Sequence, residues 1–223
     1  MSKAAEVRAW MVTLSAVVIA GVLVARILGI SEGARSPTRI SAVDKWPELV
    51  AASTPLKGGA NAEIVLLMVT DLQCPGCRHF HRIAEQSVLD NPGLVRVAYL
   101  PYPLPYHEAA RPAAQIAECI SSTGLLPNWV DYVYDHQEDL GRRPWEELLR
   151  EAAIPEPETF SRCLQPNGEV DRGIDSVIAL VDEVGISGTP LVIMNGWKYE
   201  EPPTQVQLQA DILALRDGKA PAR

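Results

Sequence analysis

Apolar and uncharged positions dominate the start of the chain. No charged residue occurs from Trp10 to Ala25, and after Arg26 the apolar positions resume at 27–30. As a helix, the segment 10–30 would be about 31 Å long, which matches the hydrocarbon thickness of a bilayer. We therefore expect a transmembrane anchor, or an uncleaved signal, over 10–30, with residues 1–9 as a cytoplasmic tail.

A buried core helix and a cleaved signal peptide are the alternatives to an anchor. A core helix that is apolar on every face would be unusual in a small domain. A cleaved signal needs a cleavage site of small residues, and no Ala-x-Ala motif follows the apolar run at the usual place. The basic residues before and after the segment are nearly balanced, so charge does not set its orientation.

The pattern changes after the apolar segment. Polar, proline and glycine residues dominate positions 31–58, apart from a short apolar patch at 46–50, and we expect a linker there. A folded domain is expected over 59–220. It begins with the continuous apolar run Ile64–Val69, whose length and β-branched residues favour a strand buried on both faces.

The pattern of the folded domain then predicts an α/β architecture. Apolar positions at helical spacing indicate a helix from about Pro75, and Leu94–Leu100 has the pattern of a second strand. A block of helices is expected at about 104–172. An amphipathic helix near 174–184, a strand at Pro190–Met194, a returning strand and a closing helix follow. This order predicts a central sheet covered by helices.

Composition limits the classes of function. The chain has 223 residues, of which 47% are hydrophobic and 22% charged, so it can form a core and is not disordered throughout. The 28 acidic residues outnumber the 20 basic ones and give a net charge of −8. This balance argues against nucleic acid as a partner, because nucleic-acid binding needs a basic surface. Nothing in the sequence indicates a nucleotide or an organic cofactor.

The most informative motif is Cys74-Pro75-Gly76-Cys77, at the predicted junction of strand and helix. Cys74 would lie at the amino terminus of the helix, where free N–H groups and the helix dipole stabilise a thiolate. Cys77 would lie one turn further, more buried and within disulfide reach. Pro75 suits the first turn, where its missing N–H costs nothing. The arrangement predicts thiol–disulfide exchange, with Cys74 attacking and Cys77 resolving.

A zinc site is the alternative use of these cysteines. His79 and His81 follow the motif, and with Cys74 and Cys77 they could complete a set of four ligands. However, these four positions lie on successive helical turns and point in different directions, whereas zinc ligands usually come from separated segments. We therefore expect no metal. His79 could instead influence the active-site thiol through its charge.

Two motifs carry a resemblance to a known family. Asp71-Leu72-Gln73-Cys74-Pro75-Gly76-Cys77-Arg78-His79-Phe80-His81 has the pattern D-x-x-C-P-x-C-x-x-F-H, and Gly185-Ile186-Ser187-Gly188-Thr189-Pro190 has the pattern G-x-x-G-T-P. In this order, with a helical block between them, they resemble the DsbA-like branch of the thioredoxin superfamily over roughly 58–218. The resemblance implies a thioredoxin-like fold with a helical insertion.

The resemblance also implies roles for further residues. Thr189–Pro190 would be a cis peptide facing the cysteines, where the backbone of Thr189 pairs with an extended substrate. The alternative is an ordinary trans proline that begins a strand. Thioredoxin and DsbA carry a buried acid six residues before the first cysteine, where this chain has Met68. Asp71 is the nearest carboxylate, so proton transfer to Cys77 would use water or another group.

Cys119 and Cys163 are the remaining cysteines, and both belong to apolar helix faces. They could be two unconnected buried thiols, which is a common use of cysteine. Some relatives in the DsbA-like branch have cysteines at similar places. In an oxidising compartment we expect a structural disulfide that holds the helical insertion.

The resemblance implies a protein disulfide oxidoreductase, and with the apolar segment 10–30 as its membrane anchor it places the catalytic domain on the extracytoplasmic, periplasmic side of a bacterial membrane. Its partners would be cysteine-containing protein substrates and a redox-regenerating protein of unknown identity. We expect a disulfide-forming oxidase that needs no cofactor beyond its own cysteines. The alternatives are a membrane-tethered thiol reductase for cytochrome or copper-site maturation, and a redox-inactive binding or metal-delivery module.

Overall fold

The computed structural model describes residues 39–166, 168–185 and 188–221. The predicted tail over 1–9 and anchor over 10–30 lie outside these residues. Within the described part of the chain, no helix is both long enough and apolar enough to cross a bilayer.

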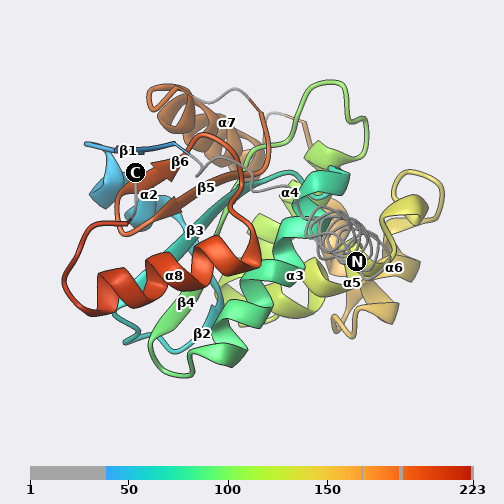
Figure 1. The fold of residues 1–223 in the computed structure, drawn as a ribbon. Coiled ribbons are helices and arrows are strands. Elements are labelled where there is room, and N and C mark those ends of the chain that lie inside the picture. Colours follow the sequence, from blue (N-terminus) through green and yellow to red (C-terminus); the bar gives the residue numbers. More distant parts are fainter. Residues whose placement is uncertain (1–38, 167, 186–187, 222–223) are drawn as a thin grey trace, which may run out of the picture. The chain divides into compact units, whose positions relative to one another are not determined.

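Six strands form one mixed sheet in the order β1-β6-β5-β3-β4-β2 (Figure 1). The strands are β1 (Ile40–Ala42), β2 (Thr54–Gly58), β3 (Ile64–Thr70), β4 (Val95–Pro101), β5 (Leu191–Met194) and β6 (Trp197–Tyr199). β3 and β4 are parallel, and every other pair is antiparallel. The central strands β3 and β5 are almost completely buried, as the continuous apolar pattern of β3 predicted.

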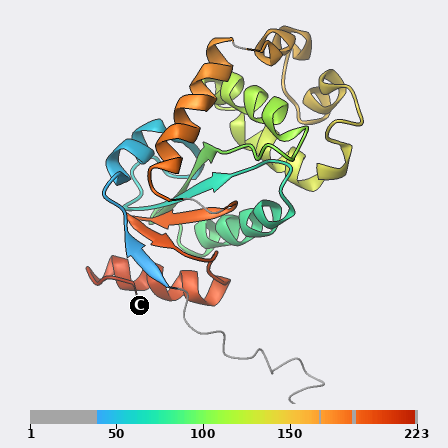
Figure 2. The same ribbon diagram turned by 90° about the horizontal axis from the view of Figure 1, so that it is seen from above.

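Helices cover both faces of the sheet (Figure 2). α2 (Trp46–Ala52) and α7 (Glu169–Asp182) lie on one face, and α3 (Pro75–Asp90) and α8 (Gln205–Arg216) lie on the other. Alternate residues of β3 supply the two halves of the core: Leu66 and Met68 pack on the α3 side, while Leu67 and Val69 pack on the α2 side. This alternation arises because successive side chains of a strand point to opposite faces of the sheet.

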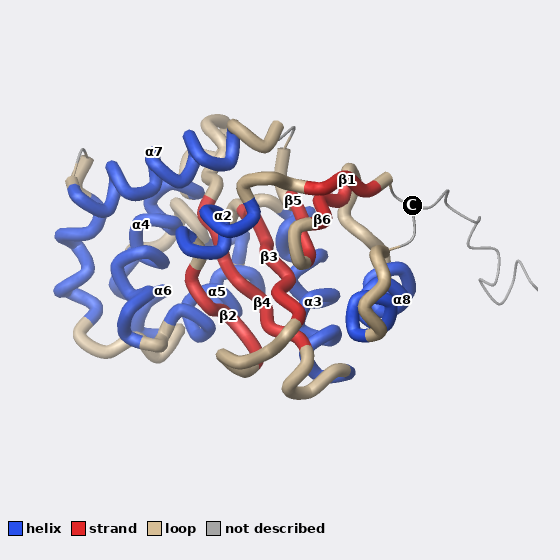
Figure 3. The backbone as a smooth tube through the Cα atoms, turned by 90° about the vertical axis from the view of Figure 1, so that its left-hand side faces the viewer, coloured by secondary structure: helices blue, strands red, loops and turns tan. Residues whose placement is uncertain are grey.

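A block of helices separates β4 from β5 (Figure 3). It comprises α4 (Ala110–Ile120), α5 (Leu126–Asp135), α6 (Trp145–Glu151) and three short 3-10 segments at Ser121–Thr123, Gln137–Asp139 and Pro157–Leu164, before α7 begins. A disulfide joins Cys119 of α4 to Cys163 of the last 3-10 segment, with the two Cα atoms 6.1 Å apart. The bond ties the beginning of the block to its end.

The prediction of a linker over 31–58 is wrong for residues 40–58, which the structure describes. Residues from Ile40 to Gly58 form β1, α2 and β2, and both strands are edges of the sheet: β1 pairs with β6, and β2 with β4. The apolar pattern did not reveal these elements because they are short and bury few side chains. In α2 only Leu49 is buried, and in β2 only Leu56.

Candidate functional site

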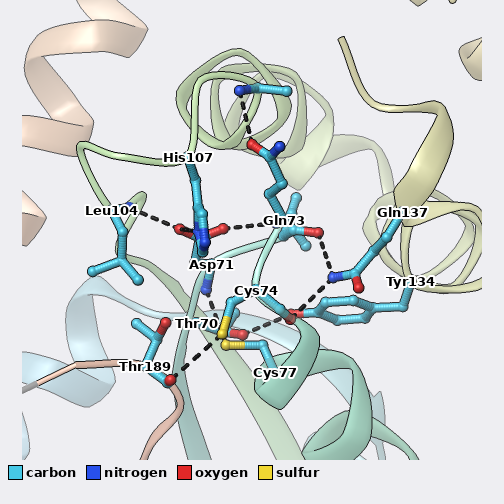
Figure 4. A network of polar contacts seen from close by, with 12 residues as sticks. Thr70, Asp71, Gln73, Cys74, Cys77, Leu104, His107, Tyr134, Gln137 and Thr189 are labelled. Atoms are coloured by element: carbon cyan, nitrogen blue, oxygen red, sulfur yellow. Dashed lines mark hydrogen bonds and ion pairs between the residues drawn. The ribbon is translucent and has the colours of Figure 1, made fainter. Parts of the chain in front are cut away.

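The two cysteines of the Cys-Pro-Gly-Cys motif lie where β3 passes into α3 (Figure 4). Cys74 is the N-cap residue of α3, and Pro75 occupies its first turn. Both thiols are free. Cys74 is 8% exposed and Cys77 is fully buried, so only Cys74 offers its sulfur to another molecule.

The environment shifts the pKa values of the two thiols in opposite directions. A hydrogen bond from Cys77 is the main reason that the pKa of Cys74 falls to about 5, with further help from Thr189 and from the N–H groups of Cys77 and Gly76, against the effect of burial. Burial raises the pKa of Cys77. At neutral pH Cys74 is therefore a thiolate and Cys77 a thiol, as an attacking and a resolving cysteine should be.

The second motif lies against the first. The peptide bond between Thr189 and Pro190 is cis, and the Cys74 sulfur lies 3.5 Å from the Thr189 carbonyl oxygen. Gly76 permits this approach, because a Cβ at Gly76 would lie 3.3 Å from Cδ of Pro190 and 3.7 Å from the Cys74 sulfur. Cys74 and Thr189 are more than a hundred residues apart in sequence, and the fold brings them into contact.

Asp71 anchors the loop that leads into the cysteines. Its buried carboxylate accepts hydrogen bonds from the Gln73 N–H at 2.7 Å and the Leu104 N–H at 2.8 Å, and it pairs with Nδ1 of His107 at 2.8 Å. The Asp71 N–H donates to the Cys77 sulfur at 3.4 Å. The carboxylate thus joins the loop to the proline-rich bend after β4, and its hydrogen-bonding capacity is used for that purpose.

The helical block supplies two more contacts to the same loop. Gln137 donates from Nε2 to the carbonyl oxygens of Leu72 and Cys74, at 2.9 and 3.0 Å. The Gln73 side-chain oxygen accepts from the N–H of Ala109 at 2.8 Å. Sequence reasoning missed Gln137 and His107, because each comes from a segment far from the cysteines and belongs to no motif.

A pair of hydroxyl groups lies beside Cys77. Thr70 is the last residue of β3, and its Oγ1 is 2.6 Å from the hydroxyl oxygen of Tyr134 on α5. Each residue is only 2% exposed. Burial raises the pKa of the Cys77 thiol, and the side chains of Thr189 and Thr70 oppose that shift in part. Sequence reasoning missed this pair as well.

The histidines of the motif do not join the cysteines. His79 is exposed on α3, and it is not among the groups that set the pKa of Cys74. His81 is buried, with Nε2 2.9 Å from a carboxylate oxygen of Asp131. Among the described residues, the one cluster with metal-ligand geometry is His81, Glu85 and Asp131. The ammonium group of Lys57 already binds both carboxylates of that cluster.

A polar recess adjoins the attacking cysteine. It has a volume of about 290 Å³ and lies next to Pro75. Its lining residues are Gln73, Pro75, Arg78, Gln137, Glu138, Leu140 and Arg142. The recess therefore lies between the start of α3 and the helical block.

Comparisons with known proteins agree with this geometry. A family model described as thioredoxin matches residues 51–213. A search of curated proteins found no match. Among solved structures, a thioredoxin-like oxidoreductase from Silicibacter pomeroyi DSS-3 is similar with a TM-score of 0.62 and 21% identity, covering 76% of this chain and 94% of that one.

Two further solved structures are similar. DsbA2 from Pseudomonas aeruginosa has a TM-score of 0.58 and 21% identity, with 70% of this chain and 90% of that chain covered. BdbD from Bacillus subtilis in its oxidised form has a TM-score of 0.60 and 15% identity, with 80% and 97% covered. The thioredoxin-like fold with a helical insertion, expected from two short motifs, is therefore confirmed.

Proposed function

The chain belongs to the thioredoxin family, and on that premise we propose that it is a DsbA-like protein disulfide oxidoreductase that forms disulfides in its substrates. The observation that carries the proposal is the pairing of an acidic, slightly exposed Cys74 with a buried Cys77 beneath the cis Thr189–Pro190 peptide. A substrate thiolate would attack the Cys74 sulfur of the oxidised pair. A second substrate thiolate would then release the reduced protein.

The acidity of Cys74 supports the oxidising direction. A folded-state pKa near 5, below the usual value of a thiol, stabilises the reduced fold at neutral pH. This stabilisation is complete above the pKa of an unfolded cysteine and is lost as the pH falls through about 5. The oxidised form has no thiolate, so the low pKa of Cys74 stabilises only the reduced form. This favours the acceptance of electrons by the Cys74–Cys77 disulfide, which is the property of an oxidant.

The substrate would be an extended segment of an unfolded or partly folded protein that contains cysteines. The backbone at the cis Thr189–Pro190 peptide, beside the Cys74 sulfur, suits pairing with such a segment, and the recess beside Pro75 could receive its neighbouring side chains. No side-chain specificity is needed for this mode of binding, since main-chain hydrogen bonds supply much of the affinity.

We place the catalytic domain on the extracytoplasmic, periplasmic side of the membrane, tethered by the apolar segment 10–30. The disulfide between Cys119 and Cys163 supports an oxidising compartment, because such bonds are rare in the reducing cytosol. A separate redox partner must then reoxidise Cys74 and Cys77 after each turnover. No organic cofactor is required for this chemistry.

A disulfide-transfer assay tests the proposed direction. The oxidised full-length chain, mixed with an equimolar reduced peptide containing two cysteines, is expected to oxidise the peptide and to gain two free thiols. Mass spectrometry after alkylation measures both changes. The matched control is Cys74→Ser, which keeps the fold and loses the attacked sulfur.

Two outcomes would contradict the oxidase. If the peptide stays reduced while the Cys74–Cys77 disulfide persists, the pair does not donate disulfides. If the reduced chain instead reduces the oxidised peptide quantitatively, the protein is a reductase.

A further inference from the structure

The polar recess beside Pro75 adjoins the attacking cysteine along the chain. Gln73 and Pro75, the residues before and after Cys74, both line it. The rest of the lining comes from Arg78 on α3 and from the segment 137–142 of the helical block. An extended chain advances about 3.4 Å per residue. A substrate that is joined to Cys74 can therefore place in the recess a side chain from within a few residues of its own cysteine.

Three charged side chains determine what the recess can bind. Its two amide side chains already serve the fold: Gln137 donates to two backbone carbonyl oxygens of the cysteine loop (Figure 4), and Gln73 accepts from a backbone N–H at the start of α4. The remaining polar side chains are Arg78, Glu138 and Arg142. Selection of a ligand by charge therefore falls to two cations and one anion.

Arg142 and its neighbour Arg143 differ in their partners. Arg143 binds three carboxylates, which belong to Asp139, Glu147 and Glu151. Arg142 is exposed, and within the part of the chain that the structure describes it forms no ion pair. The guanidinium of Arg142 is therefore available to a ligand in the recess.

The one anion of the recess is only loosely engaged. Glu138 lies 3.8 Å from the guanidinium of Arg78, which is longer than a hydrogen bond, and both side chains are partly exposed. Exposed ion pairs of this kind are weak. The positive end of the α3 dipole adds to the charge of the two arginines. The recess is thus positive, in a chain whose net charge is −8.

We propose that the recess is a subsite for an acidic side chain of the substrate, located within a few residues of the cysteine that Cys74 engages. Arg142 binds the carboxylate, and Arg78 is the second cation near it. Pro75 and Leu140 also line the recess and offer apolar surface to the methylene groups of that side chain. The inference rests on the function proposed above and adds a preference among its substrates.

Peptide oxidation rates test the inference. Each reduced peptide has two cysteines and carries Glu, Gln or Lys at the same position relative to both, and the position is moved over two residues on either side. The oxidised full-length chain is mixed with each peptide, and the second-order rate constant is measured. Dividing it by the rate constant of the same peptide with hydroxyethyl disulfide, a neutral reagent, corrects for the effect of the charge on the peptide's own thiols.

The expected result is a preference for the acidic peptide. At the position that reaches the recess, the Glu peptide should react about threefold faster than the Gln peptide, which is the effect of one exposed ion pair. The Lys peptide should react more slowly than both. The preference should fall as NaCl is raised to about 0.5 M, because salt screens exposed charges. Attraction by the net charge of −8 alone would give the reverse order.

Two variants should move the ratio of the Glu rate to the Gln rate in opposite directions. Arg142→Gln should bring it close to one, whereas Glu138→Gln should raise it, because Arg78 loses its competing partner. A general disturbance of the site would not produce opposite changes. The matched control is Arg82→Gln, one turn beyond Arg78 on α3, where the arginine pairs with Asp135 at 3.5 Å outside the recess. It should keep the wild-type ratio.

A wild-type ratio of one or less at every position would overturn the inference. So would an Arg142→Gln variant that keeps the preference, or an Arg82→Gln variant that loses as much of it. If the wild-type chain oxidises none of the peptides, the proposed function fails instead.

Discussion

Replacing Cys77 by serine is expected to leave the protein covalently joined to its substrates. The Cys74 thiolate still attacks, since its N-cap position and the cis Thr189–Pro190 peptide are unchanged. Without the resolving sulfur, release depends on external thiols, and the mixed disulfide should last on the order of minutes to hours. Non-reducing electrophoresis shows the trapped complexes as bands that disappear after treatment with dithiothreitol. Mass spectrometry of these bands identifies the substrates.

Cys74→Ser is the matched control, because it makes the same replacement of sulfur by oxygen at the other cysteine of the pair. It should trap nothing, since Cys77 is fully buried and remains a thiol. Complexes that form equally well through Cys77 would contradict the assignment of the two roles. The double variant should behave as Cys74→Ser does.

Removing the disulfide between Cys119 and Cys163 is expected to have the largest effect on stability. The bond spans a sequence separation of 44 and constrains the unfolded chain. The loop-entropy relation predicts that the double alanine variant loses about 3–4 kcal/mol of unfolding free energy. Urea unfolding of the two proteins, followed by tryptophan fluorescence, measures the difference.

The same variant tests how the helical block serves the site. The block carries Gln137 and Tyr134, which contact the cysteine loop and Thr70. Below its unfolding transition the variant should still react at Cys74. A loss of less than about 1 kcal/mol of unfolding free energy in the double alanine variant would contradict the loop-entropy relation, because the bond would then add little to the stability of the fold. Wild type treated with a reductant serves as the control without substitution.

The sequence predicted the elements with long, regular patterns. The strand predicted at 64–69, the helix from Pro75 and the strand before the hairpin appear close to their expected bounds, and the returning strand and closing helix follow in the expected order. These segments bury a continuous run or a clear stripe, so period and length suffice to identify them. The cysteine motif lies at a junction of such elements, and its place in the fold followed from theirs.

The rest of the site depends on contacts that have no local pattern. His107, Tyr134 and Gln137 reach the cysteine loop from three different segments of the chain after β4. A lone histidine, tyrosine or glutamine on a helix or in a bend has many ordinary uses. Only the folded arrangement shows which of them meet Thr70, Asp71 and the sulfur atoms.

The reduction potential of the Cys74–Cys77 pair is the most direct test of the central claim. The full-length chain would be equilibrated in glutathione buffers of defined ratio, and its thiols counted after alkylation. The account predicts a reversible two-electron couple at about −120 mV, the potential of a strong oxidant such as DsbA. A value of about −270 mV, like that of thioredoxin, would contradict an oxidase. The absence of any reversible couple would contradict the oxidoreductase itself.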